Sequence, residues 1–413
     1  MSNKCFLRSN KMNKQVGLWC VISMASIPLV MTLGNSMLIP VLPIFEDKLN
    51  ISSFQSSMII TSYSIAAILL IPIAGYLSDR FGRKKVIIPS LILTLIGGLI
   101  AGLASSMTDS PYLWIILGRI LQGFGAAGAA PIVLPLVGDL YKNDDEHASS
   151  CLGIIETSNT FGKVLSPIVG AAFAAIVWYI PFYAISVFSL ISLIFVLFFI
   201  KVPRDQNPHD PLKIFLSKTK DIFKREGNWL YVVFGIGAYT MLVLFGILFY
   251  LSDILEKSHD IEGVRKGIIL AIPLLVLCLA SLLAGKNIKG DLNVMRYLLV
   301  VGVGILSLFV PFVGFLEDNV RMLLLISSVV GLSIGALLPT LDAMITENIE
   351  KDERGTITSF YSSARFIGVA LGPPLISIFM NEYVKVIYIL GGCLGVLILI
   401  LTFIFIKPSQ QSV

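Results

Sequence analysis

Residues 75–85 read GYLSDRFGRKK, a charged run that separates two stretches of chain almost free of charge. The flanking stretches, 53–77 and 86–107, are both long enough to cross a bilayer as a helix, which takes about 20 apolar residues. The run therefore predicts a water-facing turn between two membrane-spanning helices.

The residue types within this run fit a turn on the cytoplasmic side of a membrane. Gly75 and Gly82 permit a tight reversal of the backbone that a side chain would obstruct. Arg80 and Arg83 add positive charge, which is enriched in cytoplasmic loops. Such a turn does not need an acid, so Asp79 is a candidate for a role beyond topology.

The composition of the whole chain is that of an integral membrane protein. Of its 413 residues 56% are hydrophobic and 14% are charged, whereas about a quarter are charged in soluble domains, and the mean hydropathy is +0.86. We predict twelve membrane-spanning helices, at 17–44, 53–77, 86–107, 111–138, 148–175, 179–200, 229–252, 264–284, 294–316, 321–346, 356–380 and 383–406.

The pattern of reactive residues argues against an enzyme. The five cysteines stand singly without metal-ligand or redox spacing, and the three histidines fall in predicted loops. We therefore expect no cofactor and no metal. The net charge of +5 reports orientation in the membrane, so we expect no nucleic-acid partner.

The longest hydrophilic segment, 201–228, divides the spans six and six. We predict an N-terminal bundle over 1–200, a cytoplasmic linker over 201–228 and a C-terminal bundle over 229–413. The linker stretch LKIFLSKTKDIF has the pattern of an amphipathic helix at the membrane surface. Most Lys and Arg residues fall in the termini, the linker and the even-numbered loops, which predicts that both termini are cytoplasmic.

The two halves repeat each other. A shift of 206 residues places Phe161-Gly162 on Ile367-Gly368, and Leu165-Ser166-Pro167 on Leu371-Gly372-Pro373. Two parallel six-helix halves around a site at the membrane midplane are a transporter architecture. We therefore expect an all-α membrane protein of two pseudo-symmetric six-helix bundles.

Three motifs carry a resemblance to a known family. GYLSDRFGRKK resembles the signature that the major facilitator superfamily carries between its second and third spans. RILQG at 119–123 is similar to that family's fourth-span motif, and GKVLSPIVGA at 162–171 to its fifth-span antiporter motif, with Ser166 and Ala171 where glycine is usual. Over nearly the whole chain the sequence looks most like the twelve-span drug and proton antiporters.

The resemblance implies a conformational switch at the cytoplasmic side. Asp79 would lie against the N-terminal end of the eleventh span in the outward-open state, and Arg83 would pair with Asp139. Together these contacts would form a latch between the halves that separates when the cytoplasmic side opens. The expected switch residues are Gly75, Asp79, Arg80, Gly82, Arg83 and Asp139.

Ionisable residues at membrane depth are functional candidates, because each costs several kcal/mol unless it faces a cavity or a partner. Glu156, Asn159 and Lys163 fall on one helical stripe, and the shift of 206 places Asn159 on Arg365. Either these charges form a packing network, or Glu156 carries a coupled proton beside Arg119 or Lys163. Asp342 is a second proton candidate.

Further polar side chains are candidates for substrate binding. Asn35 in the first span makes either a helix-to-helix hydrogen bond or a substrate contact. Lys163 is neutralised either by Glu156 or by an anionic substrate. The expected substrate-binding residues are Asn35, Gln122, Asn159, Lys163, Tyr239 and Arg365.

These observations favour a secondary active transporter of the cell membrane that exports small organic compounds, as in multidrug resistance, in exchange for protons by alternating access. The excess of Arg119, Lys163 and Arg365 over Glu156 leaves a second interpretation, a dedicated exporter of an anionic metabolite such as a carboxylate- or catecholate-bearing siderophore. A sugar or nutrient uptake carrier is a third, which the fifth-span motif disfavours. The expected partners are a small-molecule substrate, protons and the lipid bilayer, and the protein is expected to be a monomer.

Overall fold

The computed structural model is almost entirely helical and describes residues 17–141, 145–201, 212–288, 291–380 and 382–406. The predicted basic lead of the N-terminus and residues 202–211 of the predicted linker lie outside the described residues. Twelve helical segments are long and apolar enough to cross a membrane, which confirms the predicted number. The elements are α2 (Leu18–Ser36), η1 (Ile39–Val41), α3 (Leu42–Leu49), α4 (Ser53–Phe81), α5 (Arg83–Met107), α6 (Tyr112–Leu140), α7 (Asp145–Ile176), α8 (Ile180–Phe199), α9 (Leu212–Glu226), α10 (Asn228–Lys257), α11 (Gly263–Ile288), α12 (Leu292–Val313), α13 (Val320–Asn348), α14 (Lys351–Phe379) and α15 (Val384–Phe405).

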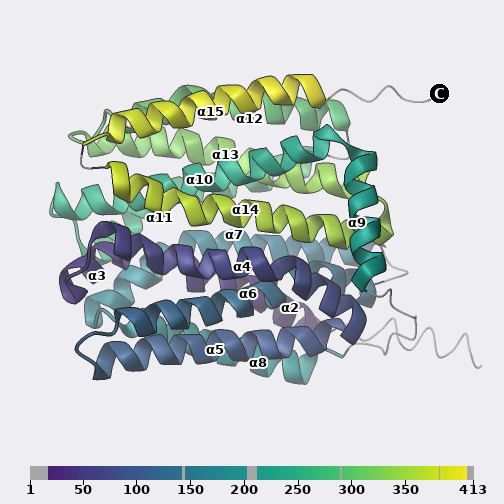
Figure 1. Cartoon of the computed structure of the whole chain (residues 1–413), viewed down its shortest axis with the longest axis horizontal. Coiled ribbons are helices and arrows are strands. Elements are labelled where there is room, and N and C mark those ends of the chain that lie inside the picture. Colours follow the sequence, from purple (N-terminus) through teal and green to yellow (C-terminus); the bar gives the residue numbers. More distant parts are fainter. Residues whose placement is uncertain (1–16, 142–144, 202–211, 289–290, 381, 407–413) are drawn as a thin grey trace, which may run out of the picture.

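The spanning helices form two bundles that lie side by side. Figure 1 shows α2 and α4 to α8 in one bundle and α10 to α15 in the other. The pairing of helices repeats between them, because α2 packs on α7 as α10 packs on α14, and α5 packs on α8 as α12 packs on α15. Across the boundary α4 packs on α14 and α7 packs on α11. The fold is the predicted pair of pseudo-symmetric six-helix bundles.

The repeated residues occupy matching places in the two bundles. Gly162 of α7 faces Thr32 of α2, and a Cβ at this glycine would lie 3.4 Å from the Thr32 Cβ. Gly368 of α14 faces Ala238 of α10, and a Cβ there would lie 2.0 Å from the Ala238 carbonyl oxygen. Both glycines thus lie where helices of one bundle cross closely.

The first span is broken, although the sequence predicts one helix over 17–44. α2 ends at Ser36, and the chain continues through η1 to α3. Pro40 and Pro43 lie at the starts of these two short helices, where proline is tolerated because its missing N–H is not needed. The break leaves the Met37 carbonyl oxygen against Gly170 of α7, 1.9 Å from where a Cβ would stand.

The run 75–85 is mostly helical rather than a loop, which corrects the predicted turn. α4 continues to Phe81, and Gly82 alone makes the reversal, with a φ of 100° that favours glycine. Gly75 therefore lies inside a helix, and a Cβ at this position would lie 2.8 Å from the Ser359 hydroxyl of α14. Its small size brings α4 and α14 together rather than turning the chain.

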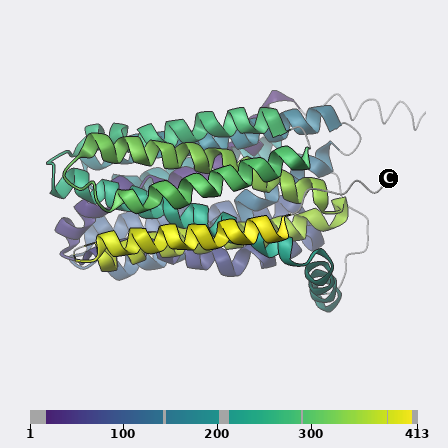
Figure 2. The same cartoon turned by 90° about the horizontal axis from the view of Figure 1, so that it is seen from above.

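The predicted amphipathic helix is α9, which runs across the ends of the spanning helices (Figures 1 and 2). Arg225 of α9 pairs with Glu353 of α14 and with Glu226. Figure 1 places α3 at the opposite end of the molecule. We refer to the two ends of the protein as the α9 end and the α3 end.

Candidate functional site

Four charged side chains from both bundles meet between them. Glu156 and Lys163 come from α7, Asp342 comes from α13 and Arg365 comes from α14. Lys163 interacts electrostatically with the other three, and Arg365 Nη1 lies 3.9 Å from Asp342 Oδ1. We call these four residues the central charge cluster. Its two acids balance its two bases, whereas the sequence alone indicates an excess of bases.

The central charge cluster is accessible to water. The side chains of Asp342 and Arg365 are 42% and 22% exposed. At the α3 end the bundles are joined, since Ser252 of α10 donates a hydrogen bond of 3.2 Å to the Ile39 carbonyl oxygen of η1. The bundles are therefore in contact at the α3 end, while Asp342 and Arg365 keep part of their side-chain surface exposed between them.

Polar neighbours hold the acid of α7 in place. The Asn159 amide donates to Glu156 Oε1 at 3.4 Å, and Asn159 Oδ1 accepts a hydrogen bond of 2.6 Å from Thr32 of α2. Thr32, which lies one helical turn before Asn35, is not among the residues predicted from the sequence. The Glu156–Asn159 contact places two of the predicted site residues together.

An aromatic ring supports the base of α14. The Arg365 guanidinium lies 5.6 Å from the centroid of Tyr361, one helical turn earlier, within the range of a cation–π contact. Gly237 of α10 gives room for this pair, because a Cβ there would lie 2.7 Å from the Tyr361 ring. Tyr361 is not among the residues predicted from the sequence, because a single tyrosine in an apolar span usually belongs to the packed interior.

Lys163 also lines a mostly apolar pocket on the α3 side of the cluster. The pocket is lined by Ser36, Ile39, Lys163, Pro167, Leu244, Phe245, Leu248, Leu270 and Leu274, which come from both bundles. The aromatic residue of this pocket is Phe245 rather than the predicted Tyr239. Tyr239 is buried and donates a hydrogen bond of 3.0 Å to the Gly391 carbonyl oxygen of α15.

Arg119 of α6 forms a separate polar cluster that is fully buried. Its guanidinium donates to the Ile59 carbonyl oxygen at 2.8 Å, the Gly34 carbonyl oxygen at 3.0 Å, Gln122 Oε1 at 2.6 Å and Asn35 Oδ1 at 2.7 Å, and lies 4.5 Å from the Tyr63 ring centroid. A buried charge must be surrounded by acceptors in this way, because leaving it unpaired costs several kcal/mol.

This second cluster differs from the sequence-based expectation. The sequence predicts either Arg119 or Lys163 beside Glu156, and the structure has Lys163 there. The hydrogen bonds of Arg119 within the described part of the chain go to carbonyl and amide oxygens. Asn35 and Gln122 were expected to bind substrate, but both are buried against Arg119. The geometry of Asn35 matches the helix-to-helix alternative, since it joins α2 to α6.

At the α9 end, Arg83 gathers the polar residues of GYLSDRFGRKK. It pairs with Asp79, donates to Ser78 Oγ at 2.7 Å and lies 3.1 Å from Asp139 Oδ2 of α6. The predicted contact between Arg83 and Asp139 is therefore present. Both residues belong to the N-terminal bundle, so this ion pair does not cross between the bundles. Arg80 donates to the Tyr76 hydroxyl at 3.1 Å.

Small residues join the bundles along α4 and α14, near the α9 end at Gly75 and closer to the middle of the helices at Ser363. Gly75 lies against Ser359, and the Ser363 hydroxyl of α14 donates a hydrogen bond of 3.2 Å to the Ile68 carbonyl oxygen of α4. Asp79 lines a cleft together with Gly355 and Ser359, near the start of α14. This is the neighbourhood that the resemblance implies for Asp79.

A family model matches most of the chain. The family model described as Major Facilitator Superfamily matches residues 24–294 and 294–413. A protein of Bacillus subtilis (strain 168) named bacillibactin exporter is 50% identical over 395 residues, which are 95% of this chain and 98% of that protein. Multidrug resistance protein 2 of the same organism is 25% identical over 92% of this chain and 93% of that protein.

Solved structures agree in fold. The D-xylose-proton symporter matches with a TM-score of 0.75 at 14% identity and covers 95% of this chain and 98% of that one. A human organic anion transporter matches with a TM-score of 0.68 at 16% identity, over 92% of this chain and 98% of that one. At these identities the likeness concerns the fold alone.

Proposed function

The chain belongs to the Major Facilitator Superfamily, and we propose that it exports a siderophore of the bacillibactin type in exchange for protons. That it is a membrane transporter of the drug-efflux type follows from its relatives, which include both the bacillibactin exporter and multidrug resistance proteins. The observation that carries the choice of cargo is the 50% identity to the bacillibactin exporter over nearly the full length of both chains.

In this proposal the α9 end faces the cytoplasm. The basic loops of the sequence support this orientation, because Lys and Arg are enriched on the cytoplasmic side. The protein as described would then have its bundles in contact at the outer end, through Ser252 and Ile39, and at the cytoplasmic end, through Gly75 and Ser359. An exporter of this fold would take up its cargo after the contact at the cytoplasmic end has opened.

The central charge cluster supports a cargo with acidic oxygen groups. Lys163 and Arg365 can donate to oxygen anions, and Glu156 and Asp342 can accept from hydroxyl groups that keep their protons at neutral pH, as phenols do. A proton on Glu156 removes the negative charge and makes one of the two acceptor oxygens a donor, which weakens the binding of such a cargo. Proton and cargo would therefore compete for the same carboxylate, which is the requirement for exchange.

The α9 end supplies the proposed conformational switch. Opening and closing this end must change the contact between α4 and α14, which passes through Gly75. Arg83 would hold the turn after α4 to α6 through Asp139, so that Asp79 keeps its place beside α14. The latch would then consist of one ion pair within a bundle and one close contact between bundles.

A bulky residue at position 75 should disturb this switch. We expect Gly75→Leu to force α4 from α14, because the larger side chain overpacks their contact at a cost of about 1–3 kcal/mol. This cost destabilises the state in which the α9 end is closed and shifts the balance of states about tenfold or more. Export rate should fall by about the same factor, measured at equal amounts of protein in the membrane. Gly138→Leu is the matched control, since nothing lies within 4 Å of a Cβ at Gly138. Normal export by the Gly75 variant would contradict this role.

A broader multidrug function is the second candidate. It is supported by the apolar lining of the pocket beside Lys163 and by the multidrug relative that spans 92% of this chain. The two functions differ in the charge of the preferred cargo. A pump for lipophilic cations would gain little from Lys163 and Arg365.

Secretion by whole cells tests the proposed cargo. Cells that make a bacillibactin-type siderophore but lack this protein should release several-fold less of it and retain it internally, and overproduction should reverse both effects. The measurement is siderophore in medium and cell extract, with accumulation of a cationic dye followed in the same cultures. Unchanged siderophore release together with increased dye retention would overturn the cargo and favour the multidrug function.

A further inference from the structure

A buried tyrosine hydroxyl beside the central charge cluster has no partner. Tyr361 of α14 is 1% exposed, and its hydroxyl has no hydrogen-bond partner among the residues that the structure describes. Buried polar groups are almost always hydrogen-bonded, because leaving such a bond unmade inside a protein is unfavourable. The hydroxyl of Tyr361 therefore needs an explanation.

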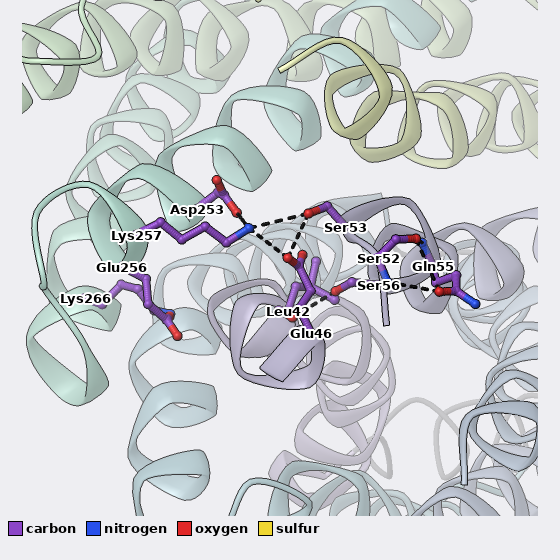
Figure 3. A network of polar contacts seen from close by, with 10 residues as sticks. All are labelled: Leu42, Glu46, Ser52, Ser53, Gln55, Ser56, Asp253, Glu256, Lys257 and Lys266. Atoms are coloured by element: carbon purple, nitrogen blue, oxygen red, sulfur yellow. Dashed lines mark hydrogen bonds and ion pairs between the residues drawn. The ribbon is translucent and has the colours of Figure 1, made fainter. Parts of the chain in front are cut away.

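The unpaired oxygens at the α3 end have a different setting. Glu46 Oε1 and Asp253 Oδ1 also lack a hydrogen bond, but they belong to carboxylates that pair with Lys257 (Figure 3). Their charges are therefore already balanced by a cation. Tyr361 has one polar atom in its side chain, and that atom is the unpartnered one.

The hydroxyl of Tyr361 lies near the central charge cluster. It interacts electrostatically with Asp342, Arg365 and Glu156, of which Asp342 acts most strongly. Packing fixes the ring, since a Cβ at Gly237 of α10 would lie 2.7 Å from its edge and the Arg365 guanidinium lies 5.6 Å from its centroid. The ring is thus held in place with its hydroxyl near the acids of the cluster.

Asp342 is the acid that is more open to a new donor. Arg365 Nη1 lies 3.9 Å from Asp342 Oδ1, beyond the limit of about 3.2 Å for a good N–H···O hydrogen bond. Glu156, by contrast, accepts a hydrogen bond from the Asn159 amide. Asp342 is thus held by a loose ion pair that a competing anion can disrupt.

A cargo with acidic oxygens competes for this ion pair. When Arg365 turns toward such a cargo, its contact with Asp342 weakens, and the carboxylate faces Glu156 without its cation. A hydroxyl that donates to Asp342 offsets this loss, because hydrogen bonds to charged groups are strong. A carboxylate has two oxygens, so Asp342 can accept from Tyr361 and from a cargo hydroxyl group at once.

We propose that Tyr361 is a positioning residue for cargo binding, whose hydroxyl donates to the Asp342 carboxylate when the cargo takes Arg365. The hydroxyl would thus gain its partner only when cargo binds. The inference rests on the proposed function, because it requires a cargo with acidic oxygens. It assigns to Tyr361 an effect on affinity that passes through Asp342 rather than through a contact with the cargo.

Removing the hydroxyl of Tyr361 tests this role. Tyr361→Phe keeps the ring that packs on Gly237 and Arg365. In proteoliposomes we expect it to raise the half-saturating siderophore concentration about tenfold, while the maximal rate stays within about twofold. Tyr388→Phe is the matched control, since Tyr388 of α15 also has a buried, unpartnered hydroxyl, but its electrostatic neighbour is Tyr250. We expect this control to transport like the parent protein.

A double-mutant cycle shows whether Tyr361 acts through Asp342. If it does, Tyr361→Phe combined with Asp342→Asn should have a half-saturating concentration within about twofold of that of Asp342→Asn alone, because a neutral amide does not need the hydroxyl. Additive losses, in which Tyr361→Phe again costs about tenfold, would show that the hydroxyl contacts the cargo itself and would overturn the proposal.

Two further results would also overturn it. One is an unchanged half-saturating concentration in Tyr361→Phe, and the other is an equal increase in Tyr388→Phe, which would indicate a general effect on packing. Failure of the proposed function looks different from these results. In that case the parent protein itself would show no saturable transport of the siderophore, and the inference would fall with it.

Discussion

Glu156→Gln should abolish transport driven by a pH gradient while leaving exchange of cargo down its own gradient. The variant side chain stays neutral and keeps its contact with Asn159, so the helix packing is preserved. It can no longer exchange a proton for a cargo hydroxyl group. In proteoliposomes we expect accumulation against a gradient to fall to the level of empty liposomes, which is the largest effect of any single change.

Asp342→Asn tests whether the other acid of the central charge cluster carries the proton instead. Asp342 is the other acid of the central charge cluster and lies beside Arg365 rather than beside Asn159. If Glu156 carries the proton, Asp342→Asn should weaken cargo binding but retain coupling to the pH gradient. Unchanged gradient-driven transport in Glu156→Gln, with loss in Asp342→Asn, would assign the proton to Asp342.

Lys163→Met should lower the affinity for a siderophore about tenfold or more. This is the loss of a charge-assisted contact worth about 1.5–3 kcal/mol in a site where Lys163 is the basic residue of the apolar pocket. Methionine keeps the length of the side chain, and cationic compounds should be handled as well or better. The measurement is the half-saturating siderophore concentration in the same proteoliposomes.

Lys163→Arg is the control, since it keeps the charge and should retain most of the affinity. A different outcome for Lys163→Met would show that Lys163 pairs with Glu156 and does not bind the cargo. If the lysine only neutralises Glu156, Lys163→Met should leave siderophore affinity unchanged. The pH optimum of transport should then move upward, because Glu156 has lost a cation that stabilises its carboxylate.

The arrangement of spans could be predicted because it depends on composition along the chain. Twelve apolar runs, the basic linker with α9 and the shift of 206 residues are all properties of the sequence, and the structure has the corresponding elements. The contact between Arg83 and Asp139 was implied by the family motif. Gly75 was misplaced because glycine and charge together resemble a turn, whereas here the glycine is a contact between helices.

The polar clusters could not be assigned in the same way. Arg119 and Glu156 both lie within predicted spans, but only the three-dimensional packing shows that Arg119 faces Asn35 and Tyr63 instead of an acid.

The most direct test of the account is cargo accumulation in inside-out membrane vesicles with an acidic lumen. We predict that vesicles containing this protein accumulate a bacillibactin-type siderophore above the outside concentration, and that collapsing the pH gradient releases it. A cationic dye measured in parallel should accumulate less. Accumulation of the dye with none of the siderophore, or siderophore uptake that ignores the pH gradient, would contradict proton-driven siderophore export.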